Sequence, residues 1–321
     1  MVAQMHSTRI AIIGAGNVGA TCAYALLLRG LATEIVLVDA NKNKAEGEAM
    51  DLNHSVPFAF PTRIWAGDYS DCTGAAVTII TAGSARLQPG QTRLDLTKTN
   101  ASVFCEIIPE VVRHNPDGIL LVASNPVDAM TYAAWKLSGL PAQRVIGSGT
   151  ILDTARFRFL LSQHFGVDTH SVHAFIIGEH GDSEVPVWSL ANIAGMHLPD
   201  FCAARGLPYD QLAMDGIFQQ TREAAYTVIE RKGATFFAIA AGLADIVEAI
   251  LRDQSTVLSV SSLIHDYCGI DDVCLSLPTA LNQGGVAWVL PMNLNPQETE
   301  AMRQSSQVLK ANIAHLELVP K

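Results

Sequence analysis

Residues 10–27 read IAIIGAGNVGATCAYALL, an apolar run followed by a glycine-rich turn and a helix-forming stretch. Gly14, Gly16 and Gly19 match the pattern GxGxxG between an expected strand and an expected helix, which is the context that gives the pattern meaning. Gly14 permits a tight turn, Gly16 lets the backbone approach a pyrophosphate, and Gly19 lets the helix pack closely on the strand. The helix N-terminus adds oriented N–H donors. The stretch therefore predicts a dinucleotide-binding unit.

A carboxylate ends the next expected strand. Asp39 follows the run EIVLV and lies 20 residues beyond Gly19. In this position a carboxylate accepts hydrogen bonds from the adenosine ribose and repels a 2′-phosphate. The alternative, a glycine-rich turn with an unrelated surface aspartate, is disfavoured by the surrounding pattern. The sequence therefore predicts NAD rather than NADP as the cofactor.

The first half of the chain alternates short β-branched runs with longer amphipathic stretches. The runs predict buried parallel strands at 9–16, 34–40, 75–83, 118–126 and 144–150. The stretches between them predict helices at 17–30, 43–55, 94–115 and 127–139. This order indicates an α/β fold with a doubly wound parallel sheet, the Rossmann fold.

The second half loses this alternation. It begins with an expected helix at 151–165 and then mixes strands at 170–178, 255–265 and 272–281 with helices near 210–231, 234–251 and 296–316. We therefore expect a second, α+β substrate domain, with the dinucleotide-binding domain at 1–148 and the substrate domain at 149–321.

The composition is that of a globular protein, with 321 residues, 49% of them hydrophobic, and a formal net charge of −10. A negative surface repels nucleic acid and anionic membranes, so we expect neither as a partner. The six cysteines form no CxxC pair, which predicts a reducing compartment and no metal site. No apolar run approaches the roughly 20 residues of a membrane span, and a cytoplasmic location is expected.

Two motifs of the second half carry polar side chains. In IIGEHGDSEVPVWS, residues 176–189, His180 is flanked by glycines that keep its surroundings open, although a lone histidine at a strand end is ordinarily structural. In GSGTILDTARFRF, residues 147–159, Asp153 and Arg156 share one helix face.

The spacing of Asp153 and Arg156 allows two interpretations. An exposed ion pair within the helix would contribute only about 0.3–0.5 kcal/mol. Alternatively, Asp153 holds His180 in one tautomer and favours its charged form, while Arg156 binds a substrate carboxylate through two parallel hydrogen bonds.

A third motif, TAGSARLQPGQTRLDLTKTN at 81–100, is a loop that can close over a ligand. Gly83 and the Pro89-Gly90 pair provide bends, and Arg86 or Arg93 can reach inward.

Five ordered segments resemble the L-lactate/malate dehydrogenase superfamily, and most closely the bacterial L-lactate dehydrogenases. They include SNPVDAMTYAAWKLSGLP and RKGATFFAIAAGLADI and lie at 35–55, 124–141, 145–159, 176–189 and 231–246. The resemblance implies an NAD-dependent oxidoreductase of glycolysis and fermentation that interconverts pyruvate and L-lactate. It also implies a homotetramer.

The resemblance assigns roles to single residues. His180 would be the acid/base, Asp153 its orienting partner, and Arg93 the group that polarises the keto oxygen. Arg156 would bind the substrate carboxylate, and Thr235 would line the substrate pocket. The implied cofactor contacts are Gly14, Gly16, Asn17, Val18, Gly19, Asp39, Thr81, Ala82, Gly83, Asn125 and Ile239, with Asn125 also near the substrate oxygen.

The residue that selects the substrate is ambiguous, because Gly83 and Arg93 are one residue further apart than the family pattern predicts. Counting forward from Gly83 gives Arg86, counting back from Arg93 gives Leu87, and Gln88 could also turn inward. An arginine would favour the second carboxylate of oxaloacetate, and a leucine an apolar side chain. The rest of the pocket is lactate-like, so we rank pyruvate first, oxaloacetate second and larger aliphatic 2-keto acids third. A non-catalytic NAD-binding protein is the remaining alternative.

Two basic residues point to regulation. In relatives that are activated by fructose 1,6-bisphosphate, an arginine and a histidine hold the effector, and the matching residues here are Arg158 and His173. The alternative is an exposed helix arginine and an unrelated polar strand residue.

Overall fold

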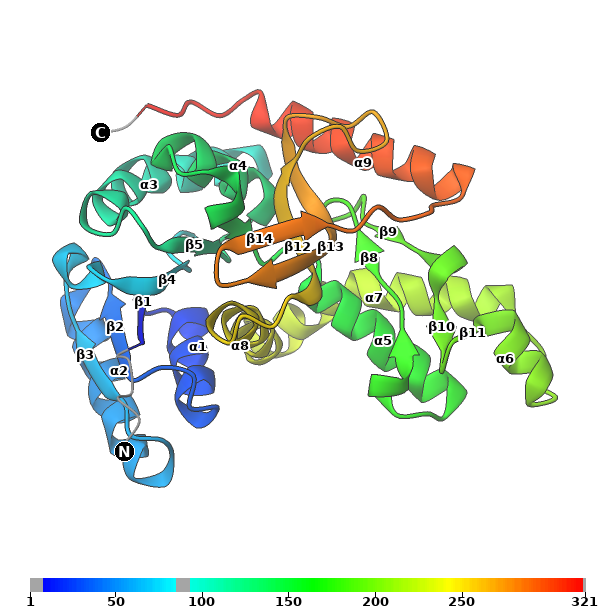
Figure 1. The fold of residues 1–321 in the computed structure, drawn as a ribbon, viewed down its shortest axis with the longest axis horizontal. Coiled ribbons are helices and arrows are strands. Elements are labelled where there is room, and N and C mark those ends of the chain that lie inside the picture. The colour runs from blue at the N-terminus through cyan, green and yellow to red at the C-terminus, as the bar shows by residue number, and fades with distance from the viewer. Residues whose placement is uncertain (1–7, 85–92, 320–321) are drawn as a thin grey trace.

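The computed structural model describes residues 8–84 and 93–319 and contains a nine-stranded sheet in the order β14-β13-β12-β6-β5-β4-β1-β2-β3 (Figure 1). Six of these strands are parallel and form the doubly wound sheet that the sequence predicts. They are β1 (Arg9–Ile13), β2 (Glu34–Val38), β3 (Arg63–Ala66), β4 (Ala75–Ile80), β5 (Ile119–Val122) and β6 (Val145–Gly147).

Strand β1 shows how the sheet acquires two cores. Its side chains alternate between the two faces, so that Ile10 and Ile12 join one apolar cluster while Ala11 and Ile13 join the other. Both faces are buried, which explains why the parallel strands are apolar throughout. The helices that cover them include α1 (Asn17–Leu28), α2 (Lys42–Ser55), α3 (Arg93–His114), α4 (Val127–Ser138) and α8 (Phe237–Leu251).

The strands of the second half extend the same sheet. β12 (Thr256–Ile264) pairs with β6 through Ser261 and Gly147, and the antiparallel strands β13 (Val273–Asn282) and β14 (Gly285–Val289) follow. The remaining α-helices of the described residues are α5 (Ile151–Phe165), α6 (Leu198–Ala204), α7 (Gln211–Lys232) and α9 (Pro296–Ile313). Small antiparallel pairings join β7 (Val172–His173), β8 (Ile176–Ile177), β9 (Val185–Pro186), β10 (Asn192–Ile193) and β11 (Met196–His197).

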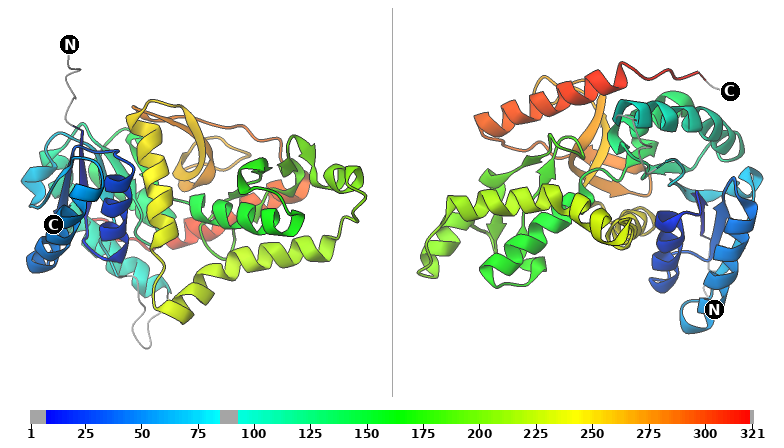
Figure 2. Two further views of the ribbon diagram at one scale, coloured as in Figure 1. Left: turned by 90° about the horizontal axis from the view of Figure 1, so that it is seen from below. Right: turned by 180° about the vertical axis from the view of Figure 1, so that it is seen from behind.

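Helix α8 belongs to the second half of the chain but packs on the first. It stands beside α1 on one face of the parallel sheet, as the yellow and dark-blue helices show (Figure 1, Figure 2). Arg29, at the end of α1, pairs with Asp245 at 2.5 Å and with Glu248, both on α8. The split at 148/149 stays a prediction, because sheet and core both cross it.

Strand β3 is the one parallel strand that the sequence analysis does not predict. It has four residues, with Arg63 exposed and Trp65 half-buried at the edge of the sheet, so it lacks the apolar run of a central strand. Among the helices in residues 8–84 and 93–319, none has the length and apolar character needed to cross a bilayer.

Candidate active site

The glycine turn lies where β1 ends and α1 begins. Gly14 has φ +106°, and a Cβ there would lie 2.7 Å from the backbone nitrogen of Ala82. A Cβ on Gly19 would collide with the carbonyl oxygen of Gly14. At Gly16, in contrast, no atom of the described residues lies within 4 Å of such a Cβ, apart from its own neighbours in the chain. The protein therefore leaves no room for a side chain at Gly14 and Gly19, whereas the space beside Gly16 is open to a ligand.

Side chains that follow neighbouring strands fix this turn. Asp39, after β2, accepts hydrogen bonds from the backbone nitrogens of Ala15 at 2.7 Å and Asn41 at 2.8 Å. Thr81, after β4, donates its hydroxyl to the carbonyl oxygen of Gly14 at 2.7 Å. The carboxyl ends of the strands thus form one edge with the geometry of a dinucleotide site.

Asp153 connects His180 and Arg156. Its Oδ2 lies 2.5 Å from Nδ1 of His180, and its Oδ1 accepts a hydrogen bond from Nη1 of Arg156 at 2.9 Å. The side chains of Asp153 and Arg156 are only 4% and 14% exposed. The i,i+3 ion pair therefore exists but is buried, and the same carboxylate also orients the imidazole.

Burial and charge shift the pKa values of this cluster in different directions. Burial alone would lower the pKa of His180, but the charge and hydrogen bond of Asp153, together with the charges of Asp128 and Glu184, outweigh it and raise the pKa to about 9. Burial would raise the pKa of Asp153, but His180 and Arg156 outweigh it and lower the pKa. The pair thus favours imidazolium beside carboxylate.

A second buried carboxylate supports the histidine from its backbone. Asp128, in α4, accepts hydrogen bonds from the backbone nitrogen of His180 at 2.8 Å and from the hydroxyl of Ser261 at 2.6 Å. Burial raises the pKa of Asp128 to about 6, although both hydrogen bonds act in the opposite direction. One side chain therefore links α4, β12 and the histidine loop.

Comparison with known proteins agrees with this geometry. Residues 8–147 match the family model "lactate/malate dehydrogenase, NAD binding domain", and residues 150–318 match "lactate/malate dehydrogenase, alpha/beta C-terminal domain". The chain belongs to the lactate/malate dehydrogenase family.

Individual members of the family are similar over nearly the whole chain. The L-lactate dehydrogenase of Acetivibrio thermocellus is 50% identical and covers 97% of this chain and 98% of its own. That of Priestia megaterium is 49% identical and covers 94% of each. The ligand-bound crystal structure of the minor L-lactate dehydrogenase from Enterococcus mundtii superposes with a TM-score of 0.94 at 40% identity, covering 98% of this chain and 99% of its own.

NAD is the cofactor of this family's N-terminal domain, and the described residues suit it. The open space at Gly16 admits a pyrophosphate beside the N-terminus of α1, and the carboxylate of Asp39 lies at the end of β2, where it can meet a ribose. Val18 and Ile239, near the starts of α1 and α8, pack on one shared apolar cluster.

The other predicted site residues are described to different extents. The carbonyl oxygen of Asn125 accepts a hydrogen bond from Asn100 at 2.7 Å, and Thr235 is half-buried before α8. Arg93 opens α3, but its side chain is outside the described part. All three candidates for the residue that selects the substrate lie outside the described residues, namely Arg86, Leu87 and Gln88.

Arg158 and His173, the predicted effector residues, line one cavity of about 340 Å³. His170 joins them there, and His173 is exposed. Nε of Arg158 donates a hydrogen bond to the carbonyl oxygen of Ala174 at 2.8 Å, and its guanidinium lies over the ring of Phe175. The structure therefore brings three basic side chains to one hollow.

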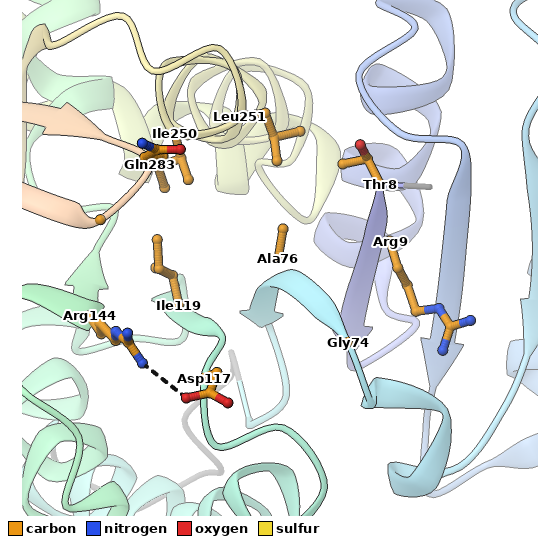
Figure 3. Close-up of a pocket in the computed structure, with 11 residues that line it drawn as sticks. Thr8, Arg9, Gly74, Ala76, Asp117, Ile119, Arg144, Ile250, Leu251 and Gln283 are labelled. Carbon is orange, nitrogen blue, oxygen red and sulfur yellow. Dashed lines mark ion pairs between the residues drawn. The ribbon is translucent and has the colours of Figure 1, made fainter. Parts of the chain in front are cut away.

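A further cavity of about 330 Å³ lies at the amino-terminal edge of the parallel strands, opposite the edge that carries the glycine turn (Figure 3). Its charged lining is already engaged, because Arg144 pairs with Asp117 at 3.6 Å and Arg9 pairs with Glu34 at 2.8 Å. It contains none of the predicted site residues.

The sequence does not predict a role for three residues around the site, Asn100, Asp128 and Glu184. Asn100 is fully buried and bonds to the backbone of Ser84 as well as to Asn125. Asp128 and Glu184 stand in quoted motifs, and acidic residues inside apolar surroundings would have been the signal. Their contacts come from distant segments, so no local spacing predicts them.

Proposed function

We propose that the protein is an NAD-dependent L-lactate dehydrogenase that interconverts pyruvate and L-lactate. The observation that carries the proposal is the buried Asp153–His180 pair with Arg156 beside it, at the strand edge that carries the glycine turn. The family, whose members act on keto and hydroxy acids, supports the same reaction class. The matched boundaries at 147 and 150 also support a division near 148/149.

In this proposal each side chain has one task. Arg156 holds the substrate carboxylate through its planar fork, and protonated His180 donates a proton to the keto oxygen during reduction. Arg93 stabilises the negative charge that develops on that oxygen. When bound, NAD supplies hydride transfer to and from the substrate carbon. In the oxidation of lactate, neutral His180 accepts the hydroxyl proton.

The test is a substrate panel with NADH. We expect kcat/KM to be highest for pyruvate, lower for oxaloacetate and lower again for larger aliphatic 2-keto acids. A preference for oxaloacetate would identify a malate dehydrogenase and favour Arg86 as the selecting residue. Absence of reduction across the panel would leave a non-catalytic NAD-binding protein. A cytoplasmic location is part of the proposal.

We also propose a homotetramer that fructose 1,6-bisphosphate activates at the cavity of Arg158 and His173. Arg158 and two histidines in one cavity offer an anion a local basic site on a protein with a net charge of −10, and the one acidic residue among the described lining, Asp245, is paired with Arg29. A twofold axis would bring two such clusters together, and an anion that binds the active tetramer more tightly shifts the population toward it.

The effector is expected to lower the pyruvate KM by about five- to 150-fold, the usual range of allosteric coupling, and to raise the tetramer fraction. The effect should be larger at mildly acidic pH, because histidine side chains gain positive charge as the pH falls. Steady-state kinetics and sedimentation measure the two changes. Arg158→Gln should abolish both, whereas Arg303→Gln, on the distant α9, should keep both. If millimolar effector at about pH 6 changes neither the pyruvate KM nor the sedimentation profile, the proposal is refuted.

A further inference from the structure

Glu184 is a buried acid for which the proposed reaction has no use. It lies between the histidine loop and β9 and is 7% exposed. Its Oε1 is buried and has no hydrogen-bond partner within residues 8–84 and 93–319. Burial without a partner disfavours the ionised form, so this carboxyl gives up its proton only in alkaline solution.

Charged groups from three directions act on this carboxyl. The charges of Asp153 and Arg156, both in α5, act on it, as do His180 in its own loop and Arg222 in α7. Burial has the largest effect and raises the pKa of Glu184 to about 8, and Asp153 acts in the same direction. The three cationic groups oppose this shift and favour ionisation.

The influence between Glu184 and His180 is mutual. The charge of Glu184 contributes to the raised pKa of His180, together with Asp153 and Asp128. The charge of each group therefore shifts the pKa of the other. A substrate carboxylate at Arg156 would cancel one of the cations that keeps Glu184 ionised and would add a negative charge.

We propose that Glu184 is a positioning residue that, in alkaline solution, takes up a proton when the carboxylate of a 2-keto acid enters the site and releases it when the acid leaves. This role rests on the proposed function, since it needs an anion at Arg156. The protonated carboxyl keeps the occupied site from holding the negative charges of Asp153, Glu184 and the substrate together around His180 and Arg156. The buried, unpaired oxygen in the segment that follows His180 carries the inference, and the charges of Asp153, His180 and Arg156 that act on it support it.

The role predicts the number of protons linked to binding. Above about pH 9, where the pKa of His180 lies, the free enzyme holds neutral His180 and ionised Glu184. Binding of an anion then requires one proton for each group, so the logarithm of Kd should rise with a slope of about two against pH. With Glu184→Gln the slope should be about one, because only His180 still takes up a proton.

The experiment is a titration of the NADH-saturated enzyme with oxamate across this pH range. Kd would rise about 100-fold per pH unit in the wild type and about tenfold in Glu184→Gln. Glu230→Gln, a matched change at an exposed position of α7, should keep the wild-type slope. Asp153 and Asp128 are ionised throughout this range and should not contribute.

The outcomes separate the two proposals. Equal slopes in the wild type and Glu184→Gln would overturn the role of Glu184 and leave the proposed function intact. If Glu184→Gln does not fold, the wild-type slope alone decides, and a value of about one would overturn the role. Failure of the wild type both to bind oxamate and to reduce any 2-keto acid would overturn the proposed function, and the role of Glu184 with it.

Discussion

Replacing Asp153 with Asn is expected to lower the reductive kcat/KM by about 10²–10⁴-fold, the usual contribution of a positioned acid/base group. The Asp153 carboxylate lies 2.5 Å from Nδ1 of His180 and stabilises the imidazolium. An amide offers no charge and can present its NH₂ group to the ring, which would favour the wrong tautomer. The buried histidine would then lose both its orientation and its proton.

The pH profile should change in a definite direction. The pKa of His180 is raised to about 9, so reduction, which requires imidazolium, should decline in the wild type as pH rises through that value. Without Asp153 the burial of the ring dominates and lowers the pKa. The decline should therefore begin at lower pH in Asp153→Asn, and lactate oxidation, which requires neutral imidazole, should show the opposite trend.

Rates in both directions measured across pH test this expectation. Asp271→Asn is a matched control, because Asp271 pairs with His265 at 3.0 Å and both side chains are 65% exposed. The control should keep the wild-type rate and profile. An Asp153→Asn enzyme that also kept both would show that the pair does not carry the proton transfer.

Replacing Arg156 with Lys is expected to weaken oxamate binding to the NADH complex by about 1.5–3 kcal/mol, or roughly 10- to 150-fold. The lysine keeps the positive charge but lacks the planar fork that forms two parallel hydrogen bonds with a carboxylate. It also changes the buried contact between Nη1 and Asp153. NADH affinity should stay unchanged, because Arg156 lies in α5 and outside the glycine turn.

Isothermal titration with oxamate and with NADH separates these effects. Arg113→Lys is the control, since Arg113 pairs with Glu110 at the same i,i+3 spacing but is 66% exposed. It should bind both ligands as the wild type does. An equal loss of NADH and oxamate affinity in Arg156→Lys would indicate a damaged fold and count against a direct contact with substrate.

The sequence predicts those parts of the fold whose signal is local. Buried parallel strands read as apolar runs, and the glycine turn requires small residues at fixed positions, as the close approach of Gly19 to Gly14 shows. Strand β3 is half-exposed and short, so it has no such signal. The pairing of Ser261 with Gly147 joins segments more than a hundred residues apart, and no local pattern contains it.

The same distinction applies to the site. His180, Asp153 and Arg156 stand out because their motifs are distinctive, but the sharing of one carboxylate between them depends on how α5 meets the histidine loop. The surroundings of Glu184 come from α5 and α7 and are set only by tertiary packing.

The packing of α8 has a consequence for inheritance. Ile12 and Leu26 share one buried apolar cluster with Leu243 and Val247 of α8, so two distant parts of the gene encode one close-packed core. A recombinant that took residues 1–148 from one relative and the rest from another would combine surfaces shaped for different neighbours. A chimera of two relatives should therefore fold stably only where α1 and α8 come from the same parent. The two halves of the gene should accordingly be inherited together.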